Sequence, residues 1–217
     1  MKKIAVILSG CGVFDGAEIH ESVLTLLALE KAGINYQCYA PDIEQLHVVN
    51  HLTGEVEGGQ SRNVLVESAR ITRGNVKSLT ELNAEDFDAL ILPGGFGAAK
   101  NLCDFALKGA DAKLQPIVLE KCRDFAQASK PAGYACIAPA MITEVYGKGV
   151  KLTIGNDQDT AAALRHMGAE HVDCAVDEVV VDEHHMVVTT PAYMLATNLL
   201  EAQRSINKMV STVVDMI

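Results

Sequence analysis

Cys136 stands where an apolar, strand-like run ends and a helix-forming run begins. The strand-like run covers 131–135 and the helix-forming run 137–145, within "KPAGYACIAPAMITEVYG". A cysteine at a strand–helix turn projects from the top of the sheet, as the nucleophile of an elbow does. The N–H groups that open the following helix favour a thiolate and lower the pKa of the thiol. We therefore interpret Cys136 as a nucleophile; the alternative is a buried cysteine that ends a core strand.

A second candidate is the glycine-rich loop in "LPGGFGAAKN" (92–101). Gly94 and Gly95 allow a sharp turn and expose backbone N–H groups to a ligand. If this loop lies beside Cys136, the N–H groups of Gly95 and Ile137 would form an oxyanion hole. The alternative is an ordinary turn between a strand and a helix.

The third candidate is a pair of carboxyl groups in "DGAEIHES" (15–22). Glu18 lies near the expected start of a helix, where a carboxylate interacts favourably with the helix dipole. Glu21 is followed by Val23, Leu24, Leu26 and Leu27, so this helix looks largely buried. Burial raises the pKa of a carboxyl group and suits it to exchange protons near neutral pH. We expect Glu21 to serve as the acid–base group.

The elements that must position these residues alternate between strands and helices. We expect strands at 3–9, 35–41, 87–95, 131–136 and 150–155, helices at 17–33, 114–129, 137–147, 159–170 and 192–216, and a hairpin at 178–190. Repeated strand–helix units indicate an α/β fold with a doubly wound, mostly parallel sheet. Residues 43–80 break this rhythm, and we interpret them as an excursion within a single domain, 1–217. In such a sheet, ligands bind beyond the carboxyl ends of the strands, where all three candidates fall.

Composition excludes several classes of function. The chain has 217 residues, 49% of them hydrophobic, and a net charge of −10, so we expect neither nucleic acid nor an anionic membrane as a partner. The apolar run near the N-terminus, 4–8, is too short for a signal peptide, which predicts a cytoplasmic protein. The six cysteines contain no C-x-x-C pair, so we expect no disulfide framework. No metal cluster is evident, and Asp15 stands where a dinucleotide-binding fingerprint would have glycine, so we expect no cofactor.

Taken together, the Glu, the P-G-G loop and the Cys elbow resemble the ThiJ/PfpI superfamily. The stretches "SGCGVFDGAEIHES", "NHLTGE", "ARITRG", "LPGGFGAAKNL", "CIAPAM" and "VVTTPAYMLA" are similar to its ElbB branch, and the match runs nearly end to end. The resemblance implies a flavodoxin-like, class I glutamine amidotransferase-like fold, a three-layer α/β/α sandwich. It also implies Cys136 as nucleophile, Glu21 as its protonated partner, Gly94, Gly95 and Ile137 as the oxyanion and substrate-binding positions, and a homodimer.

ElbB proteins are associated with isoprenoid biosynthesis and with glyoxalase activity. The resemblance therefore implies a cofactor-independent glyoxalase that converts the small dicarbonyl glyoxal to glycolate through a hemithioacetal on Cys136, an activity that can also reflect protein deglycation. One departure from the superfamily concerns a histidine that many members carry about twenty residues after the cysteine. Gly155 falls near the expected place, and no histidine occurs between Cys136 and His166.

The missing histidine keeps other functions open. A reactive cysteine also suits a redox-sensing or non-catalytic accessory protein linked to isoprenoid biosynthesis. A glutaminase-type amidotransferase subunit is a further alternative, although it needs a base that the sequence does not offer. The excursion carries Arg62, Arg70 and Arg73. These arginines would either cover the site and bind an anionic substrate or, as we expect, form a solvated helix face.

Overall fold

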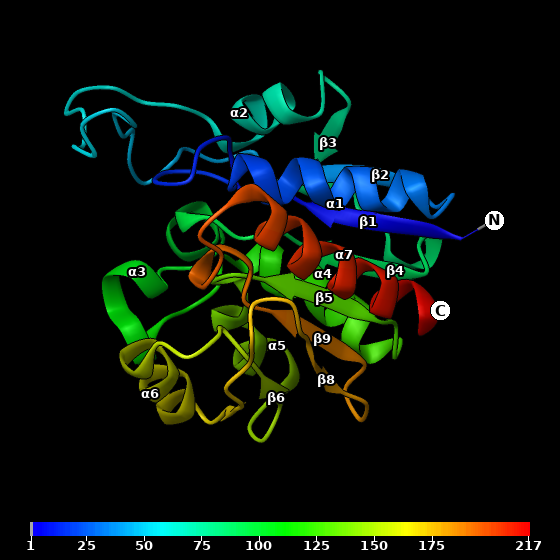
Figure 1. The fold of residues 1–217 in the computed structure, drawn as a ribbon. Helices are drawn as coiled ribbons and strands as arrows, with labels where there is room; N and C mark the ends of the chain where they lie inside the picture. The colour runs from blue at the N-terminus through cyan, green and yellow to red at the C-terminus, as the bar shows by residue number, and fades with distance from the viewer. Residues whose placement is uncertain (1) are drawn as a thin grey trace.

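Strand β4 lies at the centre of a seven-stranded sheet in the computed structural model, which describes residues 2–217 (Figure 1). The strand order is β3-β2-β1-β4-β5-β9-β8, and neighbours run parallel except for β8, which is antiparallel to β9 at one edge. A separate small sheet holds β6 and β7. The strands are β1 Lys3–Ile7, β2 Asn35–Ala40, β3 Val76–Ser78, β4 Ala89–Leu92, β5 Ala132–Ala135, β6 Lys151–Leu152, β7 Glu170–His171, β8 Val180–Asp182 and β9 Val187–Thr190.

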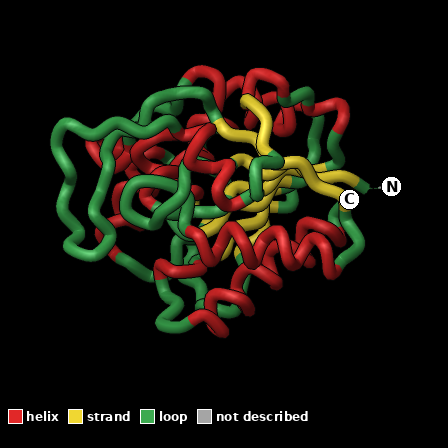
Figure 2. Tube along the Cα trace, turned by 90° about the horizontal axis from the view of Figure 1, so that it is seen from above, coloured by secondary structure: helices red, strands yellow, loops and turns green. Residues whose placement is uncertain are grey.

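Helices cover both faces of this sheet, as Figure 2 shows from above. Helices α1 and α7 pack together on one face, and α4 and α5 pack together on the other. The helices are α1 Ile19–Lys31, α2 Val64–Ile71, α3 Phe105–Lys108, α4 Pro116–Gln127, α5 Ile142–Tyr146, α6 Gln158–Met167 and α7 Leu199–Asp215. This arrangement confirms the predicted three-layer α/β/α fold with a mostly parallel sheet. No helix within 2–217 is long and apolar enough to cross a membrane.

The central strands are apolar at every position because their side chains contribute to two hydrophobic cores, one on each face of the sheet. In β1, Ile4 and Val6 contribute to the core under α1 and α7, whereas Ala5 and Ile7 contribute to the core under α4. Successive side chains of a strand point to opposite faces, so a strand covered on both sides must be apolar throughout. The covered sheet therefore gives the carboxyl ends of β1, β4 and β5 a rigid common edge.

Several predicted elements differ from the observed ones. The helix predicted at 192–216 begins only at Leu199, because Ala192 has a positive φ of 44° and Asn198 caps the helix through a 3.0 Å bond to the Glu201 N–H. Residues 192–194 form a 3₁₀ turn instead. The strand predicted at 150–155 shortens to β6, which pairs with β7 and lies outside the main sheet.

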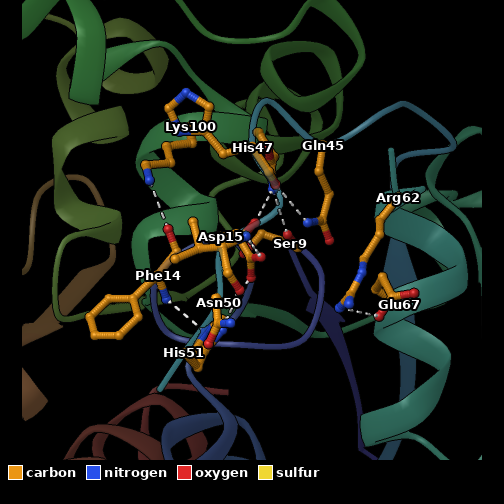
Figure 3. A network of polar contacts seen from close by, with 12 residues as sticks. Ser9, Phe14, Asp15, Gln45, His47, Asn50, His51, Arg62, Glu67 and Lys100 are labelled. Carbon is orange, nitrogen blue, oxygen red and sulfur yellow. Dashed lines mark hydrogen bonds and ion pairs between the residues drawn. The ribbon is translucent and has the colours of Figure 1, made fainter. Parts of the chain in front are cut away.

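The predicted excursion, 43–80, is partly wrong, because its last segment forms β3 and pairs with β2 at the sheet edge. Its first part forms the loops that extend beyond the carboxyl ends of the strands, away from both chain termini (Figure 1). Polar contacts hold these loops against the connection between β1 and α1, residues 8–18 (Figure 3). Asp15 accepts a 2.7 Å hydrogen bond from the Val49 N–H, and the Phe14 N–H donates to His51 over 3.2 Å.

Candidate active site

Three segments meet at the carboxyl edge of the sheet. The start of α1 contributes Glu21, the loop after β4 contributes Gly94 and Gly95, and the turn after β5 contributes Cys136. These candidate residues lie up to 115 positions apart in the chain. They are neighbours in the fold because parallel strands end at the same edge of the sheet. Their geometry follows from the backbone on which each is held.

Cys136 adopts the strained conformation of a nucleophile elbow. Strand β5 ends at Ala135, and Cys136 itself has a positive φ of 60°, which non-glycine residues rarely adopt. A 3.0 Å bond from its N–H to the Thr190 carbonyl holds this turn. The sulfur receives hydrogen bonds from the N–H groups of Gly95 and Ile137 and contacts the Glu21 carboxyl group. The predicted neighbours of Cys136 therefore do surround its sulfur; their catalytic roles stay predictions.

Glu21 has no solvent-exposed surface. Its Oε2 accepts a 2.9 Å hydrogen bond from the Gly94 N–H, and its Oε1 accepts a 3.1 Å bond from the Tyr193 N–H. Burial raises the pKa of Glu21 to about 7, against the opposing effect of these N–H donors. Glu21 can therefore hold or release a proton near neutral pH.

The thiol of Cys136 differs from the sequence-based expectation. Burial raises the pKa of Cys136 well above its ordinary value, and the nearby Glu21 charge raises it further, although the Gly95 and Ile137 N–H groups oppose both effects. The helix dipole that was expected to dominate is weak here, because the residues after the elbow form a 3₁₀ turn before the short α5. Cys136 and Glu21 therefore form a coupled pair in which Glu21 releases its proton before Cys136 does.

Positions 94 and 95 must be glycine because neighbouring parts of the chain lie where their side chains would begin. A Cβ at Gly94 would overlap the Cys136 side chain and lie 2.8 Å from Glu21 Oε2. Gly95 has a positive φ of 94°, and a Cβ there would overlap the backbone of Gly16 and Glu18. The loop can thus lie against both Cys136 and the Glu21 carboxyl group only because these residues lack side chains.

A cavity of about 530 Å³ opens onto Cys136. Its wall is mostly apolar, and its polar side chains are Glu18, Asp157, Thr160 and Tyr193 together with Cys136. Glu18 caps α1 by accepting a 2.7 Å bond from the Glu21 N–H, as its predicted role required. Sequence reasoning missed Tyr193, which contributes to the cavity wall and whose backbone N–H donates to Glu21. The motif "VVTTPAYMLA" held the only sequence signal for it.

The position near which a family histidine was expected is filled. Gly155 has a positive φ of 102°, and a Cβ built on it would lie 2.8 Å from Leu195 Cγ. Leu195 therefore occupies the space that a side chain at Gly155 would need. A histidine at position 155 would therefore require Leu195 to move.

The three arginines of the excursion do not contribute to the wall of this cavity. Glu67, on α2, pairs with Arg70 at 2.8 Å and with Arg62 at 3.6 Å, and Figure 3 shows the latter pair. Arg70 is 66% exposed, in keeping with the expected solvated helix face. Within 2–217, no group of three or more His, Cys, Asp or Glu side chains is arranged to hold a metal ion.

An α/β/α sandwich with a cysteine elbow and a buried glutamate at its carboxyl edge defines a class of cysteine-containing, amidotransferase-like proteins. Residues 2–202 match the DJ-1/PfpI family, and the chain belongs to that family. It is 44% identical to the human protein "Glutamine amidotransferase-like class 1 domain-containing protein 3, mitochondrial", over 99% of this chain and 83% of that protein.

Two solved structures extend the comparison. The isoprenoid biosynthesis protein with amidotransferase-like domain from Ehrlichia chaffeensis is 38% identical and superposes with a TM-score of 0.92, over 99% of both chains. Glyoxalase III from Candida albicans superposes with a TM-score of 0.62 over 99% of this chain and 96% of its own, but at 13% identity it shows only a shared fold.

The predicted cytoplasmic localisation is contradicted by these comparisons. The human relative, which matches 99% of this chain, is named as a mitochondrial protein. The prediction rested on a short apolar run near the N-terminus, and such a run tests only for a secretory signal. It carries no information about other compartments.

Proposed function

We propose that this protein is a cofactor-independent glyoxalase that converts glyoxal to glycolate. The observation that carries the proposal is the Cys136–Glu21 contact: a thiol at an elbow touches a buried carboxyl group whose pKa is about 7. Such a pair supplies a nucleophile and an acid–base group without a metal or a cofactor.

The reaction begins when Cys136 sulfur adds to one aldehyde carbon of glyoxal. The thiol proton of Cys136 passes by way of the Glu21 carboxylate to the aldehyde oxygen, which gives a neutral hemithioacetal and leaves Glu21 as a carboxylate. Glu21 then removes the hydrogen of the same carbon as a proton, which leaves an enediolate with its charge on the second oxygen. After the hydroxyl proton of the first carbon has been relayed to the second oxygen, Glu21 returns its own proton to the second carbon. The product is a thioester, which water hydrolyses to glycolate and the free thiol. The N–H groups of Gly95 and Ile137 are placed to stabilise negative charge on sulfur or the adjacent oxygen.

The chemistry of the cavity wall supports an uncharged substrate. Glu18 and Asp157 contribute carboxyl groups, and none of the described residues in this wall is a lysine, arginine or histidine. An anionic substrate such as a diphosphate would meet like charge and no partner. The cavity, about 530 Å³, is also far larger than glyoxal, so a dicarbonyl adduct carried on an amine or a thiol would fit. This room supports deglycation by the same adduct chemistry.

The test is glycolate formation from glyoxal by wild type and three variants. Cys136→Ser and Glu21→Gln should each lose at least about a hundredfold in kcat, because one lacks the nucleophile and the other the proton acceptor. Cys174→Ser is the matched control, since Cys174 lies outside the cavity wall, and it should keep the wild-type rate. Equal rates in Cys136→Ser and wild type would contradict the proposal.

Redox sensing is the second candidate. The contacts that surround the Cys136 sulfur, two N–H groups and a carboxyl group, would also hold the oxygens of a sulfinic acid. Mild peroxide followed by mass spectrometry tests this, with the half-buried Cys11 as an internal comparison. Oxidation of Cys11 ahead of Cys136 would count against a sensor. A glutaminase-type subunit has less support, because Leu195 fills the space near Gly155.

A further inference from the structure

Tyr193 and His20 form a hydrogen-bonded pair beside the cavity. The Tyr193 hydroxyl lies 2.8 Å from His20 Nδ1, and the two ring centroids are 5.8 Å apart. Tyr193 contributes to the cavity wall, whereas His20 is exposed near the start of α1. The pair therefore connects the cavity to solvent, and the chemistry described so far does not use it.

That chemistry lacks a donor for the second carbonyl oxygen of the substrate. Glu21 moves the proton between the two carbons, while both of its oxygens are already bound by the N–H groups of Gly94 and Tyr193. The N–H groups of Gly95 and Ile137 face the sulfur and the first oxygen beside it, not the second oxygen. Negative charge develops on the second oxygen as the carbon–hydrogen bond breaks, so an acid that protonates this oxygen would stabilise the enediol.

Tyr193 is the best-suited donor in the cavity wall. The carboxyl groups of Glu18 and Asp157 already accept N–H bonds at the starts of α1 and α6. The Tyr193 hydroxyl remains protonated, since burial, together with the charges of Glu18 and Glu21, raises the pKa of Tyr193. When His20 Nδ1–H donates to the phenolic oxygen, the phenolic proton is free to point into the cavity.

We propose that Tyr193 is a further catalytic residue, the acid that protonates the second substrate oxygen, and that His20 is the residue that positions its hydroxyl group. This inference rests on the proposed glyoxalase reaction. As Glu21 removes the proton from the first carbon, the electron pair of that bond forms the carbon–carbon double bond, and Tyr193 gives its proton to the second oxygen. Glu21 then returns its proton to the second carbon. The hydroxyl on the first carbon loses its proton to the Tyr193 oxygen, which yields the thioester and restores both side chains.

The decisive variant is Tyr193→Phe, which keeps the ring and the N–H bond to Glu21 and removes only the hydroxyl. With glyoxal as substrate, kcat should fall by about a hundredfold while KM changes by less than about twofold. The rate at which iodoacetamide alkylates Cys136 should stay within about twofold of wild type, because the nucleophile is intact. Tyr36→Phe is the matched control: it removes a hydroxyl bound to Glu30 outside the cavity and should keep wild-type kinetics.

His20 is tested by two substitutions. His20→Asn can still place an amide donor near the position of Nδ1 and should retain most of kcat, whereas His20→Ala should lose about tenfold in kcat with KM unchanged. Equal kcat in His20→Asn and His20→Ala would overturn the positioning role.

The outcomes separate this inference from the function on which it rests. An active wild type with an equally active Tyr193→Phe would overturn the donor role alone. A parallel loss of kcat and of alkylation rate in Tyr193→Phe would also overturn it, because Tyr193 would then act by shaping the Cys136–Glu21 pair. A wild type that produces no glycolate would overturn both proposals.

Discussion

The buried carboxyl group of Glu21 should make the free energy of unfolding of this protein depend on pH. The substitution Glu21→Gln should remove this dependence. Burial raises the pKa of Glu21 from 4.5 to about 7. Between these two pH values the folded chain holds a proton at Glu21 that the unfolded chain has lost. The full favourable contribution is present below pH 4.5, and it is lost as pH rises toward 7, because the charged form is the one that burial disfavours.

The magnitude follows from proton linkage. While the folded chain binds one more proton than the unfolded chain, the free energy of unfolding falls by about 1.4 kcal/mol per pH unit. From pH 4.5 to 7 this amounts to about 3 kcal/mol. Glu21→Gln cannot ionise, so the wild-type stability minus the variant stability should fall by about 3 kcal/mol between pH 4 and pH 8.

The assay is urea unfolding of both proteins at intervals across this pH range. Glu21→Gln also loses an acceptor for the N–H of Gly94 or Tyr193, which adds an offset that does not vary with pH. Only the slope is diagnostic. The exposed Glu85→Gln is the matched control and should show no such slope. A Glu21→Gln difference that is flat over pH 4–8 would refute the assignment of a raised pKa to Glu21.

Three further predictions concern the candidate site. If turnover requires Cys136 and Glu21 to hold one proton between them, kcat/KM for glyoxal should rise through about pH 7 to a plateau; a profile centred near pH 4.5 would contradict this. Iodoacetamide should alkylate Cys136 at least about tenfold faster than iodoacetate, relative to their rates with glutathione, because Glu18 and Asp157 repel the anion; peptide mapping measures both, and equal ratios would argue against an anion-excluding cavity. Gly94→Ala should destabilise the protein by about 1–3 kcal/mol and abolish turnover, since its Cβ would overlap Cys136; a fully active, equally stable variant in thermal unfolding would show that the loop relaxes freely.

The fold could be predicted well because two independent patterns in the sequence indicated the same architecture. Apolar strands without alternation indicated a sheet covered on both faces, and the alternation of strands and helices indicated parallel pairing. The convergence of Glu21, Gly95 and Cys136 could be predicted for the same reason, since parallel strands bring their carboxyl ends to one edge.

Other features of the site depend on packing that no local pattern carries. Tyr193 was hidden inside an apparent helix, 192–216, whose true start depends on the backbone of Ala192 and the cap at Asn198. The direction of the Cys136 pKa was mispredicted because burial outweighs the nearby N–H groups, and the degree of burial becomes visible only in the folded chain. The homodimer implied by the resemblance stays a prediction.

Leu195 and Gly155 also limit how this site could change in evolution. A histidine at position 155 would collide with Leu195, and the positive φ of 102° would strain any side chain there. Shortening Leu195 would relieve the overlap but not the backbone strain at position 155, so a histidine there would require changes at both places. Proton transfer at this site is therefore left to the groups that already line the cavity.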